Sequence, residues 1–393
     1  MIERSDYMTK LDENRDKPFV KVLTGMRRVG KSTLLDLYIE RLVRSGVEPD
    51  RILKINFELP EHFDIVDYRD LSRVVLVWAE GRRTPLYLFL DEVGRVEGWE
   101  KAVNGFHAMG RFDLYVTGSN ADLLSSDLST YLAGRYVEIL VHPFSYAEFR
   151  LLHRDATFRD YVTYGGIPSI GAFGFSYEAA MGALRDSYRS AILQDIVSRH
   201  QIRNAVVLDK LLGYVYANIG KTFSALSISK FLKSQRLAVT VDTILHYLEI
   251  AQAAYLIHRV PRGDLIGKAM LKTEEKYYVS DHGTREALVG NNGAAIESVL
   301  ENIVYIELLR RGYRVYVGKV GDREIDFVAE RNGKTTYYQV AYLMESEATR
   351  EREFSAFDAI DDHYPKVVVS MDRVDMSRRG VVHRNVEDFL LDE

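Results

Sequence analysis

The stretch from Gly25 to Ser32 constrains the fold of this chain more than any other part of its sequence. Its residues, GMRRVGKS, place two glycines, a lysine and a serine at the spacing of a phosphate-binding P-loop. An apolar run at 19–23 precedes it and a helical pattern at 33–38 follows it, which is the strand–loop–helix context that the motif requires. The stretch therefore predicts a nucleotide-phosphate site at the start of a helix, rather than a Gly-rich turn that binds nothing.

The role expected of each loop position follows from its residue type. Glycines let the backbone wrap around an anion, and the first amides of the helix point at the phosphates. Lys31 is expected to reach the terminal phosphates of ATP, and Ser32 to bind Mg²⁺. The expected nucleotide contacts are Gly25, Arg28, Gly30, Lys31, Ser32 and Thr33. Arg27 also lies in the loop, and one of the two arginines can equally face solvent.

A second motif lies at 86–92, about sixty residues further on, where an apolar run ends in Asp91 and Glu92. Such a run predicts a parallel strand buried on both faces, and open α/β sheets bind ligands at the carboxyl ends of their strands. This is the Walker B pattern, in which Asp91 holds Mg²⁺, directly or through water, and Glu92 polarises the attacking water. A strand that merely ends at two solvated acids is the alternative, and the P-loop upstream argues against it.

Another strand, expected at 113–116, ends at Thr117-Gly118-Ser119-Asn120. A small polar residue at the tip of a strand beside Walker B can reach between the attacking water and the γ-phosphate. Asn120, or else Ser119, is the candidate for this role. An ordinary helix cap before the segment 121–124 is the alternative.

The composition limits the class of protein. A chain of 393 residues predicts two to four domains, and the absence of cysteine excludes disulfides, thiolate metal sites and cysteine nucleophiles. No apolar run approaches the roughly 18 residues of a membrane helix, and the charged start differs from a signal peptide, so we expect a cytoplasmic protein without a membrane partner. The net charge of −5 neither favours nor forbids nucleic-acid binding.

Four segments together resemble a family of archaeal and bacterial AAA-type ATPases that carry a C-terminal restriction-endonuclease-like domain. They are GMRRVGKSTLL, LFLDEV, VTGSNADLLSSDLSTYLAGRY and VHPFSYAEF. The resemblance covers essentially the whole chain and implies an α/β fold in four parts. These are an AAA-type ATPase core at 1–150, a helical lid at 151–204, a winged helix at 205–290, and the endonuclease-like α/β domain at 291–393.

The resemblance also implies a homo-oligomeric ring, with a hexamer as the expected size. Arg135 matches the Gly-Arg pair of that family and is the candidate finger that reaches a neighbouring subunit's γ-phosphate; a salt-bridging surface arginine is the alternative. Within the lid, a long helix is expected at 177–200. Arg199 near its end is the candidate second sensor of the nucleotide, although a solvated arginine near a helix C-terminus needs no function.

The segment 205–290 has the helix and strand order of a winged helix-turn-helix. Its recognition helix offers acidic to neutral residues, which argues against base-specific reading: Thr240, Asp242, Thr243, His246 and Glu249. Positive residues cluster on the preceding segment and the wing: Lys221, Lys230, Lys233, Arg236, Arg262, Lys268 and Lys272. They can grip DNA phosphates without reading sequence, and a winged helix used for packing or oligomerisation is the alternative.

The C-terminal segment departs from the nuclease pattern at its chemical centre. On that pattern Glu301 supplies a helix carboxylate and Asp326 a strand carboxylate, and the next strand should contain Glu-x-Lys. It contains Gln339-Val340-Ala341, which lacks one acid and the lysine that stabilises the transition state. Unless a lysine enters from elsewhere in the fold, we expect a degenerate domain that binds nucleic acid or serves assembly.

These observations predict an enzyme that hydrolyses ATP with Mg²⁺ and uses the energy to move or remodel DNA. A nucleotide-controlled signalling switch that binds proteins is the alternative function. A metal-dependent nuclease is the third and least favoured.

Overall fold

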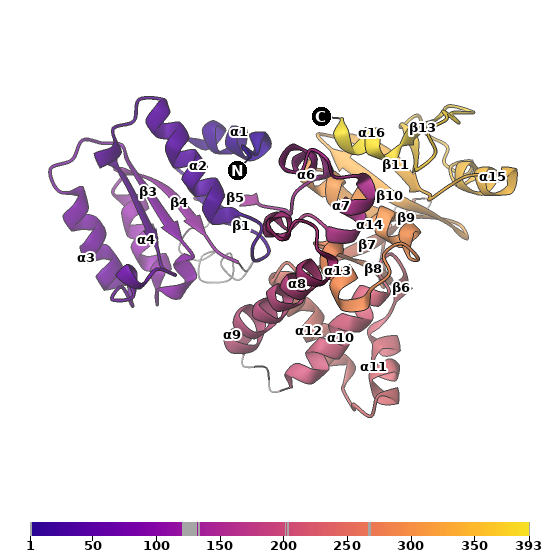
Figure 1. Ribbon diagram of the computed structural model, residues 1–393, viewed down its shortest axis with the longest axis horizontal. Helices are drawn as coiled ribbons and strands as arrows, with labels where there is room; N and C mark the ends of the chain where they lie inside the picture. The colour runs from indigo at the N-terminus through magenta and orange to yellow at the C-terminus, as the bar shows by residue number, and fades with distance from the viewer. Residues whose placement is uncertain are drawn as a thin grey trace. The chain divides into compact units, whose positions relative to one another are not determined.

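The structure is a computed structural model and describes residues 2–119, 132, 134–200, 202, 204–265 and 269–392, without the side chains of residues 194, 199 and 269–274 (Figure 1). It divides into two compact units. The first comprises Met1–Val141 and Ala253–Tyr255, and the second comprises His142–Gln252 and Leu256–Glu393. None of the described helices is both long and apolar enough to cross a membrane.

The first unit is built on a five-stranded parallel sheet in the order β2-β3-β4-β1-β5. Its strands are β1 (Val20–Thr24), β2 (Ile52–Asn56), β3 (Leu86–Asp91), β4 (Phe112–Thr117) and β5 (Tyr136–Leu140). Strands β1 and β3 are buried at every position, as continuous apolar runs predict for strands inside a parallel sheet. The carboxyl ends of β1, β3 and β4 therefore meet at one edge.

Among the described residues, the α-helices of this unit are α1 (Ser5–Asn14), α2 (Lys31–Arg44), α3 (Tyr68–Ala79) and α4 (Trp99–Ala108). Helix α2 starts at the P-loop lysine, as the motif requires. The side chain of Asp67 caps α3 by accepting from the backbone N–H groups of Arg69 and Asp70. The apolar core joins β1, β3 and β4 to the inner faces of α3 and α4.

The second unit begins with a helical part. Its helices are α6 (Tyr146–Leu152), α7 (Phe158–Tyr164), α8 (Tyr177–Ala191), α9 (Ser198–His200), α10 (Ala205–Ala217), α11 (Ala225–Ser234), α12 (Val241–Ala253) and α13 (His282–Val289). The long helix expected at 177–200 exists, but a π-helical stretch, Ile192–Val197, separates α8 from α9. A π-helical insertion shifts the phase of a helix, which residue propensity does not reveal.

The second unit also contains an eight-stranded mixed sheet in the order β13-β12-β11-β10-β9-β7-β8-β6. Its strands are β6 (Thr222–Phe223), β7 (Ile257–Asp264), β8 (Ala269–Val279), β9 (Arg314–Val320), β10 (Arg323–Arg331), β11 (Lys334–Val340), β12 (Lys366–Ser370) and β13 (Val381–Asn385). Helices α14 (Ile296–Arg310), α15 (Glu347–Ser355) and α16 (Val386–Leu391) complete this part.

One pairing in this sheet was not predicted. Strands β7 and β8 form an antiparallel hairpin, and β7 also pairs in parallel with β9, so that Arg262 lies opposite Val317. The hairpin expected to be a free wing is therefore continuous with the sheet of the C-terminal segment.

Candidate functional site

The P-loop joins β1 to α2 in a conformation that requires its glycines. Gly30 has φ 93° and lies at the N-cap of α2. Gly25 has φ 135°, and a Cβ atom added to it would lie 2.2 Å from the carbonyl oxygen of Val141. A side chain at Gly25 would therefore displace the loop. The loop leads into the N-terminus of α2, and backbone amides at the N-terminus of a helix attract anions.

The ammonium group of Lys31 is held at the loop. Its Nζ donates to the carbonyl oxygens of Gly25, at 2.9 Å, and Met26, at 3.2 Å. The same atom lies 3.9 Å from Oε1 of Glu92, and the residue is 5% exposed. The site thus carries a buried positive charge beside the backbone that would surround a phosphate.

The side chain of Asp91, at the end of β3, is oriented by two hydroxyl groups. Ser32 Oγ donates to Asp91 Oδ1 at 3.0 Å, and Thr117 Oγ1 donates to the same oxygen at 2.6 Å. Asp91 Oδ2 is buried and has no hydrogen-bond partner, and the ammonium nitrogen of Lys54 lies 3.7 Å from it. An unpaired carboxylate oxygen beside a serine hydroxyl fits a hard divalent cation, so Asp91 and Ser32 would hold Mg²⁺.

Glu92 follows Asp91 and turns sharply out of the strand. Its φ is 56°, a left-handed conformation that is costly for a residue other than glycine and clusters at functional sites. Its backbone N–H donates to Thr117 Oγ1 at 2.8 Å. Burial raises the pKa of Glu92, and the nearby charge of Lys31 opposes this shift only in part. A carboxylate with a raised pKa can accept a proton from water more readily.

Thr117 was missed by the sequence reasoning, which chose Asn120 or Ser119 from the same strand end. Asn120 lies outside the described residues, and Ser119 is buried. Thr117 contacts both Walker B acids because β4 lies next to β3 in the sheet. Its position at the last residue of the strand was the signal available in the sequence.

The remaining nucleotide candidates differ in environment. Thr33 and Arg28 are exposed at the start of α2 and in the loop. Arg27 Nη2 lies 3.5 Å from Glu58 Oε1, and Arg95 Nη2 lies 2.7 Å from the same oxygen. Arg28 is therefore the arginine of the loop that faces solvent.

Arg135 lies at the amino end of β5, where its carbonyl accepts from the N–H of Val20. The P-loop follows the carboxyl end of β1, whereas Arg135 precedes β5, which runs parallel to β1. The length of one strand, about 16 Å, therefore separates Arg135 from the P-loop. The Arg135 side chain is exposed and donates to Asn104 Oδ1 at 3.3 Å. Within its own chain it therefore lies at the edge of the sheet opposite the P-loop. The side chain of Arg199 is outside the described part of the chain.

Comparison with known proteins agrees with this geometry. Residues 17–150 match the model of an AAA domain, and residues 155–295 match that of a domain of unknown function. An uncharacterized protein of Haemophilus influenzae is 36% identical over 380 residues, which cover 94% of this chain and 93% of that protein. The chain belongs to a family of AAA-type P-loop ATPases.

Further relatives of the ATPase are more distant. An uncharacterized protein of Methanocaldococcus jannaschii is 27% identical over 381 residues, covering 91% of the ATPase and 81% of that protein. Among solved structures, a Walker-type ATPase of Pyrococcus abyssi is 16% identical with a TM-score of 0.46, covering 73% of the ATPase and 96% of that chain. The Orc1 protein of Aeropyrum pernix, solved in complex with DNA, is 14% identical with a TM-score of 0.29, covering 75% of the ATPase and 94% of that chain. Structural likenesses this slight do not bear on function.

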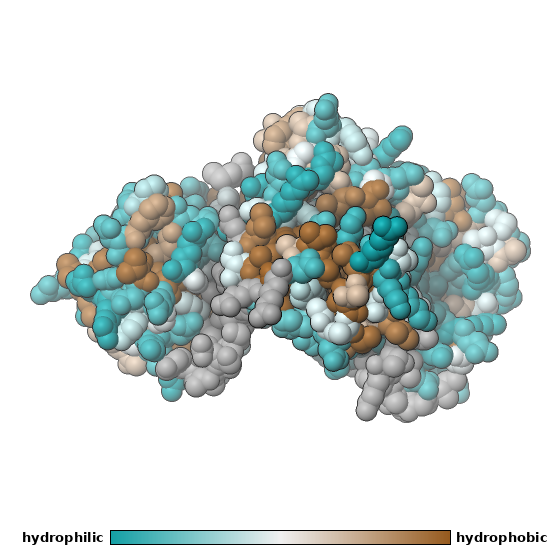
Figure 2. Space-filling view, turned by 90° about the horizontal axis from the view of Figure 1, so that it is seen from below, coloured by the Kyte–Doolittle hydropathy of each residue, from teal (hydrophilic) through white to brown (hydrophobic). Residues whose placement is uncertain are grey.

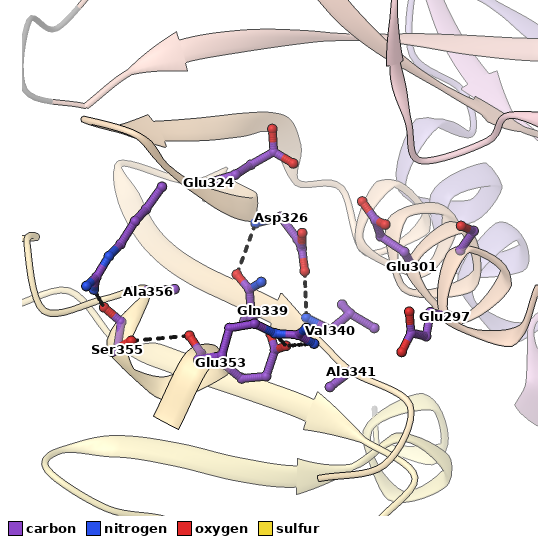
Figure 3. A pocket seen from close by; sticks show the side chains of 13 residues that line it. Glu297, Glu301, Glu324, Asp326, Gln339, Val340, Ala341, Glu353, Ser355 and Ala356 are labelled. Atoms are coloured by element: carbon purple, nitrogen blue, oxygen red, sulfur yellow. Dashed lines mark hydrogen bonds and ion pairs between the residues drawn. The ribbon is translucent and has the colours of Figure 1, made fainter. Parts of the chain in front are cut away.

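The second unit of the ATPase brings together the three residues expected from the nuclease pattern (Figure 3). Glu301 from α14, Asp326 from β10 and Gln339 from β11 line one pocket of about 540 Å³. Gln339 Oε1 accepts from the backbone N–H of Asp326 at 3.3 Å, and Asp326 Oδ2 accepts from the N–H of Val340 at 2.8 Å. Gln339 thus orients the strand that carries Asp326.

A lysine from another part of the ATPase does reach acids that line this pocket. Lys276, on β8, places Nζ 2.7 Å from Glu301 Oε1, 2.7 Å from Glu324 Oε1 and 3.8 Å from Asp326 Oδ1. Across the described residues, no group of three or more His, Cys, Asp or Glu side chains is arranged to hold a metal ion. With the ammonium group of Lys276 among Glu301, Glu324 and Asp326, this site does not fit the divalent cation that the nuclease pattern implies.

One of the residues expected to grip DNA is placed elsewhere by the structure of the ATPase. Arg262 is buried, and its Nη2 is paired with Glu324 Oε2 at 2.9 Å, because β7 lies inside the sheet. That expectation was wrong for Arg262. Lys268 and the side chain of Lys272 lie outside the described residues. The others are exposed: Lys221, Lys230, Lys233 and Arg236.

Proposed function

We propose that this ATPase hydrolyses ATP to ADP and phosphate with Mg²⁺, works as a homo-oligomeric ring that we expect to be a hexamer, and uses hydrolysis to move or remodel DNA. The observation that carries the proposal is the group of Ser32, Asp91, Thr117 and Glu92, which hydrogen bonds join, with the ammonium group of Lys31 3.9 Å from Glu92. Each chemical role that phosphoryl transfer needs has a side chain in this group.

The proposed reaction assigns one task to each residue. The carboxylate of Glu92 accepts a proton as the oxygen of water attacks the γ-phosphorus, and the bond from that phosphorus to the bridging oxygen of ADP breaks. Lys31 stabilises the charge that develops on the phosphate oxygens. Mg²⁺, held by Asp91 and Ser32, would neutralise charge on the β- and γ-phosphates. Thr117 keeps both acids oriented.

Two substitutions test the chemistry. Lys31→Ala should abolish turnover while the protein stays folded, because the phosphates lose their cation. Glu92→Gln should bind ATP and fail to hydrolyse it, because the amide cannot accept a proton. The measurements are phosphate release and equilibrium binding of labelled ATP. Undiminished hydrolysis in both variants would refute the assignment.

DNA as the target of the ATPase is supported by one surface of the proposed winged helix at 205–290. Helices α10, α11 and α12 and the hairpin β7–β8 occur in winged-helix order. The four exposed cations at 221, 230, 233 and 236 lie on and beside α11, whereas α12 exposes Asp242, His246 and Glu249. Such a surface would contact the phosphates of DNA and would not distinguish one base sequence from another.

Salt dependence tests this part of the proposal. Binding and ATPase rate should be measured with single-stranded, duplex and branched DNA from low to high salt. Affinity should fall steeply with salt, and the double variant Lys230→Ala/Lys233→Ala should reduce the slope by roughly two. The exposed Lys334→Ala, on β11, is the matched control. A response that is flat for every DNA would remove DNA from the proposal.

A second candidate, a nucleotide-controlled switch that binds proteins, is favoured by a different observation. Figure 2 shows hydrophobic residues gathered in the middle of the view, on the side where α9 to α12 lie. Large exposed apolar residues of this part are Leu193, Val206, Leu226, Val241 and Leu245. Exposed apolar patches mark protein contacts more often than DNA contacts. This candidate predicts ATP turnover that is indifferent to DNA, and the same panel of DNA substrates separates the two.

A further inference from the structure

The carboxylates of the C-terminal pocket already surround a cation that belongs to the chain. Lys276 lies within 4 Å of Glu301, Glu324 and Asp326, and its side chain is 5% exposed. Arg262 adds a second cation by pairing with Glu324, and the hydroxyl of Tyr278 donates to Glu301. Three carboxylates are therefore matched by two internal cations and a hydroxyl group.

The electrostatics of this group depend on its burial. Burial, together with the charge of Glu301, raises the pKa of Asp326 well above its usual range. Burial by itself would lower the pKa of Lys276, but the charges of Glu301, Asp326 and Glu324 outweigh it and raise that pKa above its usual value. The ammonium group of Lys276 therefore stabilises acids that would otherwise be buried without a counter-ion.

Lys276 comes from a different strand than the lysine of the nuclease pattern, and its position determines what the pocket can do. In the pattern that the sequence resembles, the lysine follows the carboxylates on a neighbouring strand, here at Ala341. Lys276 instead comes from β8, which enters the sheet through the pairing of β7 with β9. It contacts Glu301 and Glu324 directly, and Figure 3 shows these two acids at the pocket together with Glu297, Asp326 and Gln339.

We propose that Lys276 is the resident cation of this carboxylate site, where its ammonium group takes the place of a divalent metal. The pocket is then closed to metal-dependent phosphodiester hydrolysis. Its carboxylates instead fasten the hairpin β7–β8 to α14 and β10, so these acids join the proposed winged helix to the C-terminal segment. This assignment is independent of what the ATPase acts on.

The test is a count of bound Mn²⁺ by electron paramagnetic resonance, without nucleotide, on the full chain. Wild-type protein and Asp326→Asn should bind the same number of Mn²⁺ ions, because the pocket holds none. Lys276→Met should bind one more per chain, and the double variant Lys276→Met/Asp326→Asn should lose it again. Lys334→Met, an exposed lysine of the same sheet, should match wild type.

Two results would overturn the assignment. A Mn²⁺ ion bound by wild type and lost in Asp326→Asn would show that the pocket is a metal site despite Lys276. A folded Lys276→Met protein that gains no Mn²⁺ would show that the ammonium group does not stand where a metal would bind. The comparison of wild type with Asp326→Asn decides the first point even if Lys276→Met does not fold.

Discussion

Thr117 connects the two acids of the Walker B strand to the neighbouring strand, and its role can be isolated with one substitution. Thr117→Val keeps the shape of the side chain and removes the hydrogen bonds to Asp91 Oδ1 and from the N–H of Glu92. If these bonds lower the barrier of the chemical step by about 1–2 kcal/mol, their loss should reduce kcat by about 5- to 30-fold, with ATP affinity nearly unchanged. Steady-state kinetics and ATP binding measure the two effects.

The conservative change supplies the control for this prediction. Thr117→Ser keeps the hydroxyl group and should retain most of the turnover. If the valine variant hydrolyses ATP at the wild-type rate, the contacts of Thr117 are structural and do not position the acids for catalysis.

Glu92 predicts a pH dependence of stability as well. Because its pKa is raised in the folded chain, its protonated form favours folding, and this contribution is lost as the pH rises from the ordinary glutamate range through the folded pKa. At neutral pH, Glu92→Gln should therefore be more stable than wild type, and the gain should shrink as the pH falls. Chemical denaturation of nucleotide-free protein over a pH series measures it. A gain that does not change with pH would contradict this explanation.

At the scale of elements, a glycine contact joins α7 to α13 within the second unit. The backbone N–H of Gly166 donates to Asp281 Oδ1 at 2.8 Å, and Asp281 also caps α13. A Cβ atom added to Gly283 would lie 2.1 Å from the carbonyl oxygen of Tyr164. The segment Tyr164-Gly165-Gly166-Ile167-Pro168, which stands out in the sequence without an evident chemical role, is thus a packing joint.

A matched pair of alanine substitutions tests this joint. Gly283→Ala should lower the free energy of unfolding by about 1–3 kcal/mol, because backbone atoms must move apart. Gly182→Ala, in α8 with nothing within 4 Å of the added Cβ, should instead raise it by about 0.5–1 kcal/mol. Both residues lie in the second unit, so one denaturation transition reports on both. Equal effects of the two changes would contradict the proposed contact.

At the scale of the whole molecule, the position of Arg135 predicts that the active site needs a second subunit. Arg135→Ala should bind ATP and hydrolyse it slowly, and Lys31→Ala should not hydrolyse it. When the two variants are mixed in equal amounts, about a quarter of the sites should regain wild-type activity, because an intact P-loop then meets an intact arginine in a ring. The phosphate release of the mixture measures the recovery.

A second mixture controls for this recovery. Lys31→Ala and Glu92→Gln damage the same half of the site, so their mixture should stay inactive. Absence of recovery in the first mixture would remove Arg135 as the finger. A mass measurement with a slowly hydrolysed ATP analogue would give the number of subunits.

The sequence by itself determined where this protein would bind a nucleotide, because a P-loop is made of residues that are close together in the chain. Gly25, Gly30, Lys31 and Ser32 form the loop within eight positions, and the apolar run before Asp91 identified a buried parallel strand. Local patterns of this kind are set by backbone conformation and strand burial, which short stretches of sequence encode.

Only the tertiary structure decided which residues meet across strands. Thr117 reaches Asp91 because β4 lies beside β3, and Lys276 reaches Glu301 because the pairing of β7 with β9 carries the hairpin into the C-terminal sheet. Strand order depends on the packing of the whole unit, and no local pattern contains it. The sequence showed that the strand of Gln339 lacks a lysine, and the sheet showed that the chain supplies one from elsewhere.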